Sequence, residues 1–540
     1  MRAIYFYVNQ FLEHLSIVPK IWFKLGLCIV FLCSAFIAKA QVKPFSLFSD
    51  NTVLQREIEV PIWGTALGCN TVTIQYNGQT KIATVVNGKW ITKLSPMKAN
   101  SEPLDMRLSC EKNEVVLHNV VVGEVWLAGG QSNMEKPLGL RKNQKPILNW
   151  EEEAAAANYP AIREFSLPRN NSEQVPVSAI NAQWKVCNPT NVISFSAVAY
   201  FFAQQLHLQY NIPIGIIHSS WGGTNIERWM RKELLQSNPE FATVLNNYNQ
   251  AVVSYPERMA LFNAKKDSLK IKWTADSALA IVAKKPLPIK PAAPDAPSDP
   301  NPMRSGNYGT LYKTMIEPLM PYAIKGVIWY QGESNSRNPD MYAKLFPAMI
   351  KDWREQWKIG EFPFLFVQIA PFRTGSPELR EAQLLTALQT PKTAMVVTID
   401  CGDSTDIHPT NKKPVGQRLA LAARALAYNE KGVVYSGPLY QSFTVKNDAI
   451  EISFTHTGKG LKANGDSLIG FSISPNGKDF IDATALIRKN KVVVSSPTVV
   501  KPIAVRYAFV KNPVGNLFNI DGLPASPFRT DIPLATNKIN

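Results

Sequence analysis

The sequence predicts an α/β protein in which a three-layer domain with a parallel sheet is flanked in the chain by small β-sandwich domains. In the middle of the chain, short runs that are apolar throughout alternate with helix-like stretches, as expected of parallel strands covered on both faces. At both ends, runs of alternating polarity are separated by turn residues, which is typical of antiparallel strands. A chain of 540 residues is long enough for several domains.

Residues 1–40 have the features of a signal peptide. Lys20 and Lys24 precede the apolar stretch LGLCIVFLCSAFIA (25–38), and small residues typical of a cleavage site follow it. The apolar stretch is short for a membrane-spanning helix. We therefore expect cleavage after Ala40 and an exported protein, secreted or periplasmic, without a membrane span.

Residues 41–120 are predicted to form an N-terminal β-domain. The alternating run VTIQYNGQTKIATVVNGKWITKL contains Asn77-Gly78 and Asn87-Gly88, and Asn-Gly between alternating runs is a strong hairpin signal. Four cysteines remain after residue 40, which allow three connectivities if two disulfides form: Cys69, Cys110, Cys187 and Cys401. Cys69 and Cys110 lie in this β segment and are the pair that we expect.

Residues 121–430 are predicted to form the catalytic α/β domain. The expected strands are VWLA (125–128), IGIIH (214–218), GVIWY (326–330), FLFVQIA (364–370) and MVVTI (395–399). The expected helices are residues 196–210, 310–320 and 415–429. Parallel strands alternating with helices give a sheet with helices on both sides.

Two further segments differ from this pattern. Residues 240–303 form an insertion with a long amphipathic run and then seven prolines between Pro286 and Pro302. The proline-rich run suits neither a helix nor a central strand, so we expect it to form a stiff excursion on the surface. A loop insertion without a chemical role is the simpler interpretation. Residues 431–540 return to β-branched runs such as 492–510 and predict a C-terminal β-domain.

Polar loops follow the predicted strands of the catalytic domain. They are Gly129–Asn133, Ser219–Asn225, Gln331–Asn335 and Asp400–Pro409. In open α/β sheets, ligands bind at the carboxyl ends of the strands, so these loops should share one edge. A serine, a histidine with neighbouring carboxylates and several glycine or amide donors at one edge indicate acyl transfer.

The histidines determine which base could serve Ser132. After residue 40 they are His118, His207, His218, His408 and His456. His408 is the best base because Asp406 and Asp403 are beside it, and His218, at the end of a strand, is the only rival. The backbone amide of Ser132, a glycine amide from Gly222-Gly223 and the side-chain amide of Asn335 are the natural donors to an oxyanion.

Other classes of site have little support in the sequence. Gly130 to Met134 lacks the second glycine of a G-x-S-x-G elbow, so an ordinary α/β-hydrolase is not indicated. The chain has neither His-Glu-x-x-His nor paired Cys-x-x-Cys, and we expect no metal. The net charge of +16 is spread thinly rather than gathered in basic runs, and we expect no nucleic-acid partner.

Four blocks, in the order Gly-Gln-Ser-Asn, Gly-Gly-Thr, Gln-Gly-Glu-Ser-Asn and Asp-Ile-His-Pro, resemble those of the SGNH hydrolases, and specifically of the sialate O-acetylesterase-like carbohydrate esterases. The resemblance extends over nearly the whole chain after residue 40 and includes residues 47–56, 315–335, 407–420 and 516–531. It implies a flavodoxin-like three-layer domain. It also implies a serine esterase that removes O-acetyl groups from carbohydrates, as in sialate 9-O-deacetylation, through an acetyl-serine intermediate and without a cofactor.

The resemblance also implies roles for single residues. Ser132 corresponds to the nucleophile and His408 to the base, with Asp406 as its orienting acid. The oxyanion-hole donors correspond to Ser132, Gly223 and Asn335, with Gly222 as an alternative to Gly223. Many SGNH enzymes carry Asp three residues before the histidine, where this chain has Thr405. Asp403 or Glu333 could therefore orient His408 instead, and Gln131 and Trp221 are the proposed substrate contacts.

Several alternatives remain open at the level of sequence. An acetylxylan or pectin-type polysaccharide acetylesterase would use the same mechanism on another acetylated glycan. A glycoside hydrolase would use Glu333 with Asp406 as paired carboxylates, and a glycan-binding protein would use none of these groups catalytically. Trp221, Trp229 and Tyr330 could stack on sugars, although core packing explains aromatic residues at these positions equally well.

Overall fold

A computed structural model describes residues 40–111, 113–172 and 180–532 of the chain. The predicted signal peptide lies outside these residues except for Ala40. Among the described residues, no helix has both the length and the apolar character required to cross a membrane. The described residues divide into two compact units, and the smaller one comprises residues 40–45 with Ile62–Lys93 and Met106–Val116. The domain limits given above stay predictions.

The smaller unit consists of antiparallel strands. One sheet has the order β1 (Gln41–Pro44), β3 (Val60–Leu67) and β6 (Lys89–Leu94), while β4 (Thr71–Tyr76) pairs with both β5 (Gln79–Thr84) and β7 (Asn100–Cys110). Asn77 and Gly78 join β4 to β5 with positive φ values of 48° and 72°, so this Asn-Gly pair makes the expected tight hairpin. A disulfide links Cys69 to Cys110, as expected, and Cys187 and Cys401 are free and buried.

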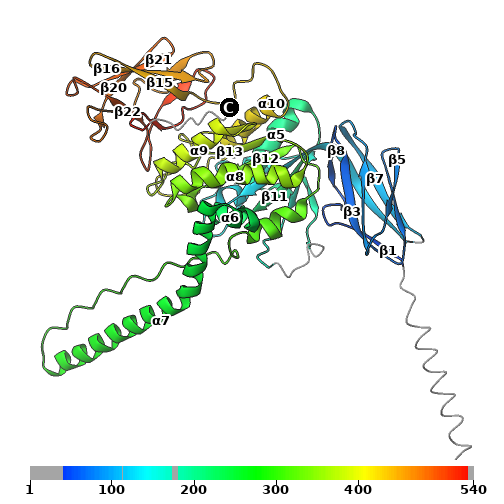
Figure 1. Cartoon of the computed structure of the whole chain (residues 1–540), viewed down its shortest axis with the longest axis horizontal. Helices are drawn as coiled ribbons and strands as arrows, with labels where there is room; N and C mark the ends of the chain where they lie inside the picture. Colours follow the sequence, from blue (N-terminus) through cyan, green and yellow to red (C-terminus); the bar gives the residue numbers. More distant parts are fainter. Residues whose placement is uncertain (1–39, 112, 173–179, 533–540) are drawn as a thin grey trace, which may run out of the picture. The chain divides into compact units, whose positions relative to one another are not determined.

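The larger unit is built on a central sheet (Figure 1). Its strand order is β10 (Trp184–Cys187), β9 (Tyr159–Ser166), β11 (Ile214–Ser220), β8 (Asn113–Gly130), β12 (Gly326–Tyr330), β13 (Phe364–Val367) and β14 (Thr393–Val396). Only β10 and β9 pair antiparallel along this path; the other neighbours are parallel. The short strand β2 (Val53–Gln55) pairs parallel with the first half of β8.

Helices cover both faces of this sheet. On one face, α5 (Ala197–Tyr210) and α10 (Lys413–Leu426) share a buried apolar cluster with strand residues such as Ala128 and Ile328. On the other face, Trp329 packs against Trp353 of α8 (Pro339–Trp357), and α9 (Pro377–Gln389) packs beside α8. The alternation of side chains along β12 therefore supplies both cores, which confirms the predicted three-layer α/β fold.

The strand register brings the loops of the site to one edge of the sheet. Gly130 at the end of β8 is opposite Ser220 at the end of β11 and Tyr330 at the end of β12. The chain therefore leaves three adjacent strands at the same level, as expected for a binding edge at their carboxyl ends.

Several elements differ from the sequence expectations, and strands β9 and β10 and helices α8 and α9 are among those that were not predicted. Strand β9 was not predicted because Arg163 and Glu164 interrupt its apolar pattern, although both are buried and hydrogen-bonded in the structure. The helix predicted over residues 310–320 is wrong as a regular α-helix. The chain forms a π-helical turn at Tyr312–Ile316 and a 3-10 turn at Glu317–Leu319, where Pro318 has no N–H to donate.

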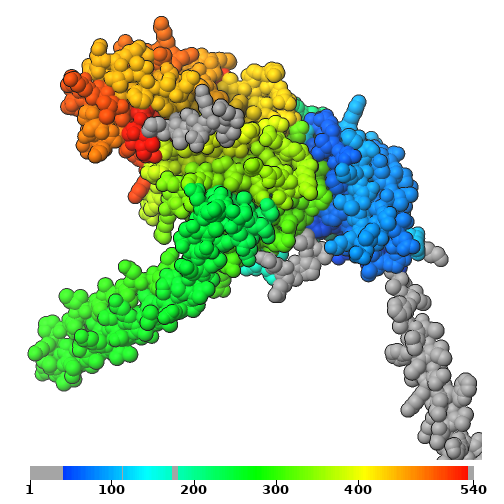
Figure 2. Space-filling view, in the orientation of Figure 1, coloured from blue at the N-terminus to red at the C-terminus, as the bar shows by residue number. Residues whose placement is uncertain are grey.

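The insertion contains a helix followed by an irregular return. After α6 (Lys232–Ser237), helix α7 (Pro239–Val282) extends away from the sheet, and the Pro-rich segment returns without helix or strand to Pro302. The indole N–H of Trp273 donates to the carbonyl oxygen of Pro288 at 3.0 Å, so the return packs on the helix. Figure 2 shows helix and return together as one arm.

The C-terminal part of the larger unit is antiparallel β structure. One sheet has the order β15 (Leu439–Lys446), β16 (Ala449–Thr455), β21 (Lys491–Ser495) and β20 (Thr484–Arg488). The other has β19 (Ile481–Asp482), β18 (Phe471–Ser474), β22 (Ala504–Tyr507) and β24 (Phe528–Arg529). Phe528 contacts the rings of Phe454 and Tyr507, so aromatic packing joins the two sheets.

Candidate active site

Ser132 lies at the start of a short helix that follows β8 directly. Gly130 has a φ of +131°, and a Cβ there would lie 2.2 Å from the carbonyl oxygen of Tyr330, so the turn requires glycine. The next amide, of Gln131, donates to that same oxygen at 2.9 Å, and the carbonyl of Gly130 accepts from the Trp221 amide at 3.0 Å. These bonds to the neighbouring strands fix the turn, and they leave Ser132 half-buried at the beginning of α2 (Ser132–Glu135).

The structure brings Ser132, His408 and Asp406 together. The hydroxyl oxygen of Ser132 lies 2.9 Å from His408 Nε2, and His408 Nδ1 lies 3.4 Å from Asp406 Oδ1. The same carboxylate oxygen accepts from the backbone amide of His408 at 2.8 Å. Burial lowers the pKa of His408 below its usual value, and Lys412 and Lys136 act in the same direction, whereas Asp406 opposes them. The imidazole is therefore neutral near pH 7, the form that can accept a proton.

Two hydrogen bonds hold the His408 loop against the Ser132 turn. Lys136 Nζ donates to the carbonyl oxygen of His408 at 3.2 Å, and the side-chain amide of Asn133 donates to the carbonyl oxygen of Ile407 at 3.0 Å. Because both donors lie within four residues of Ser132, the turn that carries the hydroxyl also fixes the loop that carries the imidazole.

Beneath these two loops lies a buried polar network that the sequence did not reveal. Lys412 Nζ donates to Asn133 Oδ1 at 2.6 Å, and Asn133 Nδ2 donates to Glu333 Oε1 at 2.7 Å. Burial lowers the pKa of Lys412 to about 7 and raises the pKa of Glu333. Asn133 therefore links both groups to the site, and it was visible in the sequence only as part of the Gly-Gln-Ser-Asn block.

The two alternative acids make other contacts. Glu333 accepts from Asn133, and Asp403 accepts from Lys145 Nζ at 2.5 Å and from the Thr405 amide at 2.8 Å. The hydrogen bond from Lys145 lowers the pKa of Asp403. Within the described chain, Asp406 is the carboxylate whose oxygen lies near the His408 ring, 3.4 Å from Nδ1.

The two glycines after β11 differ in their hydrogen bonds. The amide of Gly222 donates to Glu135 Oε2 at 3.2 Å, and a Cβ on Gly222 would lie 3.0 Å from the Cβ of Ser132. Gly223 is exposed with a φ of +74°, and its amide has no hydrogen-bond partner in residues 40–111, 113–172 and 180–532. Of the two amides, that of Gly223 is therefore the one that can donate to a ligand beside Ser132.

The orientation of the Asn335 side chain is fixed by three hydrogen bonds. Its carbonyl oxygen accepts from the Ile226 amide at 2.9 Å and from Gln331 Nε2 at 2.8 Å, while its Nδ2 donates to Glu227 Oε2 at 2.9 Å. This pattern assigns the oxygen and nitrogen of the amide unambiguously and leaves one N–H of Nδ2 for a ligand. Burial raises the pKa of Glu227, a residue that no sequence pattern singled out.

The rival histidine forms a second set of the same composition. His218 Nε2 lies 2.6 Å from the hydroxyl oxygen of Ser220, and its Nδ1 lies 3.4 Å from Glu164 Oε1. All three residues are buried, with relative exposures of 9%, 6% and 1% for His218, Ser220 and Glu164. His118 and His456 lie elsewhere and contact Asp105 and Thr455, and His207 contacts the carbonyl oxygen of Ile212.

The remaining predicted residues are mostly in the core. Trp229 and Tyr330 are 0% and 1% exposed, so stacking on a sugar is wrong for these two rings and core packing explains them. Trp221 is 7% exposed beneath the guanidinium of Arg169. Gln131 is 3% exposed, and its side-chain oxygen has no hydrogen-bond partner in the described chain. No cluster of three or more metal-ligating side chains occurs among the described residues.

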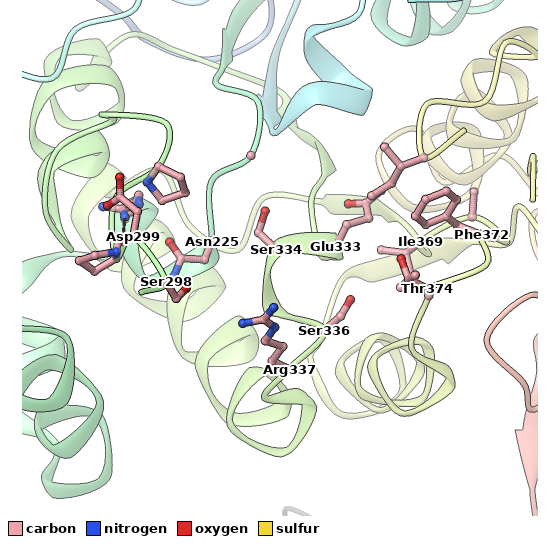
Figure 3. A pocket seen from close by; sticks show the side chains of 17 residues that line it. Asn225, Ser298, Asp299, Glu333, Ser334, Ser336, Arg337, Ile369, Phe372 and Thr374 are labelled. Atoms are coloured by element: carbon pink, nitrogen blue, oxygen red, sulfur yellow. Dashed lines mark hydrogen bonds between the residues drawn. The ribbon is translucent and has the colours of Figure 1, made fainter. Parts of the chain in front are cut away.

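A cavity of about 650 Å³ lies next to this site (Figure 3). Its lining includes Gly223, Glu333 and Ile407, which are parts of or neighbours to the groups described above. Farther out it is lined by polar side chains, among them Ser336, Arg337 and Thr374. A polar cavity of this size beside a Ser–His pair can hold a ligand much larger than an acetyl group.

Comparison with known proteins identifies the class of enzyme. The sequence model of the carbohydrate esterases described as sialic acid-specific acetylesterases matches residues 122–262 and 301–425. The sialate O-acetylesterase of Rattus norvegicus is 31% identical over 461 residues, which cover 76% of this chain and 78% of the relative. The sialate O-acetylesterase of Homo sapiens is 31% identical over 437 residues, covering 73% and 72%. This chain belongs to the sialic acid-specific acetylesterase family of carbohydrate esterases.

A solved structure extends the similarity to the whole fold of this esterase. A carbohydrate acetylesterase from Xanthomonas citri is similar with a TM-score of 0.74 and 33% sequence identity, covering 91% of this chain and 99% of that chain. The resemblance noted in the sequence is thereby confirmed, together with the fold class that it implied. The protein is a carbohydrate esterase that acts in O-deacetylation of carbohydrates.

Proposed function

We propose that this esterase is an exported serine enzyme that removes O-acetyl groups from a glycan through an acetyl-serine intermediate. Ser132 is the nucleophile, His408 the general base and Asp406 its orienting acid. The 2.9 Å contact between Ser132 Oγ and His408 Nε2 is the observation that carries the proposal. Export rests on the signal-peptide features of residues 1–40.

In the first half of the reaction, Ser132 Oγ attacks the carbonyl carbon of the acetyl group while its proton passes to His408 Nε2. The bond between that carbon and the sugar oxygen then breaks, and the protonated imidazole gives its proton to the departing sugar oxygen. The acetyl group remains on Ser132, and the sugar leaves with a free hydroxyl group. A neutral imidazole is needed at the start, which agrees with the lowered pKa of His408.

In the second half, a water molecule attacks the carbonyl carbon of the acetyl-serine while His408 Nε2 takes one of its protons. The bond to Ser132 Oγ breaks, acetate leaves, and the proton returns to the serine oxygen. One ester and one water are thus converted into one acetate, one proton and one sugar hydroxyl group. The reaction involves no change of oxidation state, so no oxidant or reductant is required.

The charge that develops on the carbonyl oxygen is stabilised by three donors in this proposal. They are the amide of Ser132, the amide of Gly223 and the free N–H of Asn335 Nδ2. The unpaired Gly223 amide and the three hydrogen bonds that fix Asn335 support these assignments. Donors that are oriented before the reaction stabilise a transition state without reorganising, and each one is worth about 2.7–4 kcal/mol in kcat.

The substrate class that we propose first is an O-acetylated sialic acid, because the mammalian relatives are named sialate O-acetylesterases. Acetylxylan or pectin-type polysaccharides are the alternatives with the same mechanism. Acetate release from a panel of acetylated sialosides and plant polysaccharides distinguishes them. The preferred substrate is the one with the highest kcat/KM.

Replacement of the nucleophile is the direct test of the mechanism. We expect Ser132→Ala to lower kcat on 4-nitrophenyl acetate by at least about 10³-fold, because the covalent intermediate can no longer form. Ser220→Ala is the matched control, since this serine also contacts a histidine at the end of a neighbouring strand, and we expect it to keep its activity. Both variants should retain the wild-type circular dichroism spectrum.

A chemical label gives an independent readout. A fluorophosphonate should form an adduct on the wild-type protein, and peptide mass spectrometry should locate it on Ser132 and not on Ser220. Near-normal turnover by Ser132→Ala, or an adduct on another serine, would contradict the proposed mechanism.

A further inference from the structure

The inference concerns the part of the arm that lies between the two stretches matched by the family's sequence model. Residues 263–300 are outside both matched stretches and comprise the outer half of α7 and most of the Pro-rich return. Ser298, Asp299 and Pro300, at the end of this segment, line the cavity beside the active site. The expectation of a loop without chemistry therefore does not account for where the segment ends.

The end of the segment is anchored to the catalytic unit. Arg228, which is 3% exposed, donates from Nη2 to the carbonyl oxygen of Pro300 at 3.0 Å. The same guanidinium donates from Nη1 to Tyr248 Oη at 3.3 Å and to the carbonyl oxygen of Gly306. It also lies over the rings of Tyr248 and Tyr308, which stack 3.8 Å apart. The chain at Pro300, which lines the cavity, is thus held in place by Arg228.

The outer part of the arm is held as well. Trp273 on α7 donates to the carbonyl oxygen of Pro288, and Lys290 lies 5.9 Å from the centre of the Trp273 ring. Proline-rich chain is stiff, so a return that packs on the helix and ends at a buried arginine delivers its last residues to a defined place.

The cavity offers groups that suit a saccharide. Figure 3 shows Ser298 and Asp299 on one side beside Asn225, with Phe372 and Thr374 on the opposite side and Arg337 between them. Hydroxyl, amide, carboxylate and guanidinium groups all hydrogen-bond to sugar hydroxyls, and an aromatic ring can pack on a sugar face. Both a cation and an anion are present, so the lining is suited to several hydroxyl groups rather than to one charged group.

We propose that the segment 263–300 is a specificity-determining wall, in which Ser298 and Asp299 bind hydroxyl groups of sugar rings beyond the acetylated one. The enzyme then prefers acetylated oligosaccharides to acetylated monosaccharides. The Oδ1 atom of Asp299 accepts from the Asn301 amide at 2.7 Å, and Oδ2 has no hydrogen bond within the described residues. Oδ2 is therefore the atom that accepts from a sugar hydroxyl. This inference rests on the proposed function.

The test compares the double variant S298A/D299N with the wild type on three esters. They are 4-nitrophenyl acetate, an acetylated monosaccharide and an acetylated trisaccharide of the same sugar. Asparagine at 299 still offers an oxygen to the Asn301 amide, so the turn is kept. We expect KM for the trisaccharide to rise about threefold to tenfold for each hydrogen bond lost, with kcat unchanged. The two smaller esters should show no change.

Asp295→Asn is the matched control, because Asp295 lies in the same segment and carries the same charge but does not line the cavity. It should leave all three esters unaffected. A double variant that keeps the wild-type KM for the trisaccharide would overturn the inference, as would a wild type whose kcat/KM is equal for trisaccharide and monosaccharide.

Binding measured without turnover separates this inference from the mechanism. The deacetylated trisaccharide is titrated calorimetrically into Ser132→Ala and into the same protein with S298A/D299N. We expect the affinity to fall by the same factor as KM rises, whatever the catalytic role of Ser132. If Ser132→Ala itself retains full activity, the proposed function fails while this binding result still stands.

Discussion

The molecule carries two Ser–His–carboxylate sets at the same edge of its central sheet. Ser132, His408 and Asp406 form the first set, with distances of 2.9 and 3.4 Å between successive groups. Ser220 and His218 form the second with Glu164, with distances of 2.6 and 3.4 Å. The interatomic distances are so similar that they do not identify the catalytic set.

The surroundings of the two sets differ. Ser220, His218 and Glu164 are all buried, and the Glu164 oxygens also accept from the Ser196 amide and the Ser166 hydroxyl, so this carboxylate joins several elements of the core. By contrast, the His408 side chain is 20% exposed, and Ser132 is half-buried. A nucleophile has to reach a carbonyl carbon, and only the first set can be approached by a glycan.

Access and oriented donors, rather than a Ser–His contact, are therefore the grounds on which we propose Ser132 as the nucleophile. Among the described residues the Gly223 amide is unpaired and the Asn335 amide is held by hydrogen bonds, and Gly223 lines the cavity together with Ile407, the neighbour of His408. A polar triad that is enclosed by packed residues contributes hydrogen bonds to the fold instead.

The largest difference between the two sets should appear when each histidine is replaced by alanine in a separate variant. We expect His408→Ala to lower kcat on 4-nitrophenyl acetate by at least about 10³-fold, because His408 is the base that contacts the Ser132 hydroxyl among the described residues. His218→Ala should leave kcat unchanged but lower the free energy of unfolding by about 1–3 kcal/mol, since it removes the imidazole that contacts the buried Ser220 hydroxyl and one of the contacts of Glu164.

Both histidine variants are measured by steady-state kinetics and by urea unfolding followed with tryptophan fluorescence. Loss of activity by His218→Ala at unchanged stability would contradict a purely structural role for the second set, because this set would then take part in the reaction.

The carboxylates should show an intermediate effect. A carboxylate bonded tightly to its histidine contributes about 10⁴-fold to kcat, and the longer 3.4 Å contact of Asp406 leads us to expect a loss of about 10- to 100-fold in Asp406→Asn. Glu164→Gln should instead lower the urea midpoint, because an amide N–H would face one of the donors that Glu164 accepts. Full activity of Asp406→Asn would show that Ser132 and His408 act without an orienting acid.

The positions of the site residues could be predicted because strand ends are visible in the sequence. The apolar runs end at Ala128, His218 and Tyr330, within two residues of the observed strand ends, and the register of the parallel strands then places their following loops together. Ser132, Gly223, Asn335 and His408 all lie in such loops, and the order of the blocks added the family. These inferences needed only the apolar runs in the sequence and the fact that the carboxyl ends of neighbouring parallel strands lie at one edge of a sheet.

Other features could not be predicted because they depend on pairings between distant residues. Strand β9 is stabilised by buried charges such as Arg163, which contacts Asn119, and buried charge is the opposite of the pattern used to find strands. Glu227 is 108 residues from Asn335, and only the folded chain brings the two together. The wall at Ser298 and Asp299 likewise depends on where a long arm returns, which proline content does not specify.

The smallest expected effect is a shift in the pH dependence of kcat/KM, which depends on His408 of the first set. In the proposed mechanism His408 is a neutral base, so kcat/KM should fall as the pH drops through its pKa, which burial, Lys412 and Lys136 lower and Asp406 raises. Removing the cation in Lys136→Met should raise the pKa of His408 and move the acid limb of the profile to higher pH. Asp406→Asn should move the acid limb to lower pH.

Lys145→Met is the matched control for the lysine, because Lys145 pairs with Asp403 on the loop of His408 and is not among the groups that shift the pKa of this histidine. It should leave the acid limb in place. The profiles are measured with 4-nitrophenyl acetate between pH 4 and about 8, a range that brackets the usual histidine pKa of about 6.5. Shifts of Lys136→Met and Asp406→Asn in the same direction would mean that His408 is not the group whose titration limits the reaction. Opposite shifts would show that the acid limb reports the titration of His408, whose pKa Lys136 lowers and Asp406 raises.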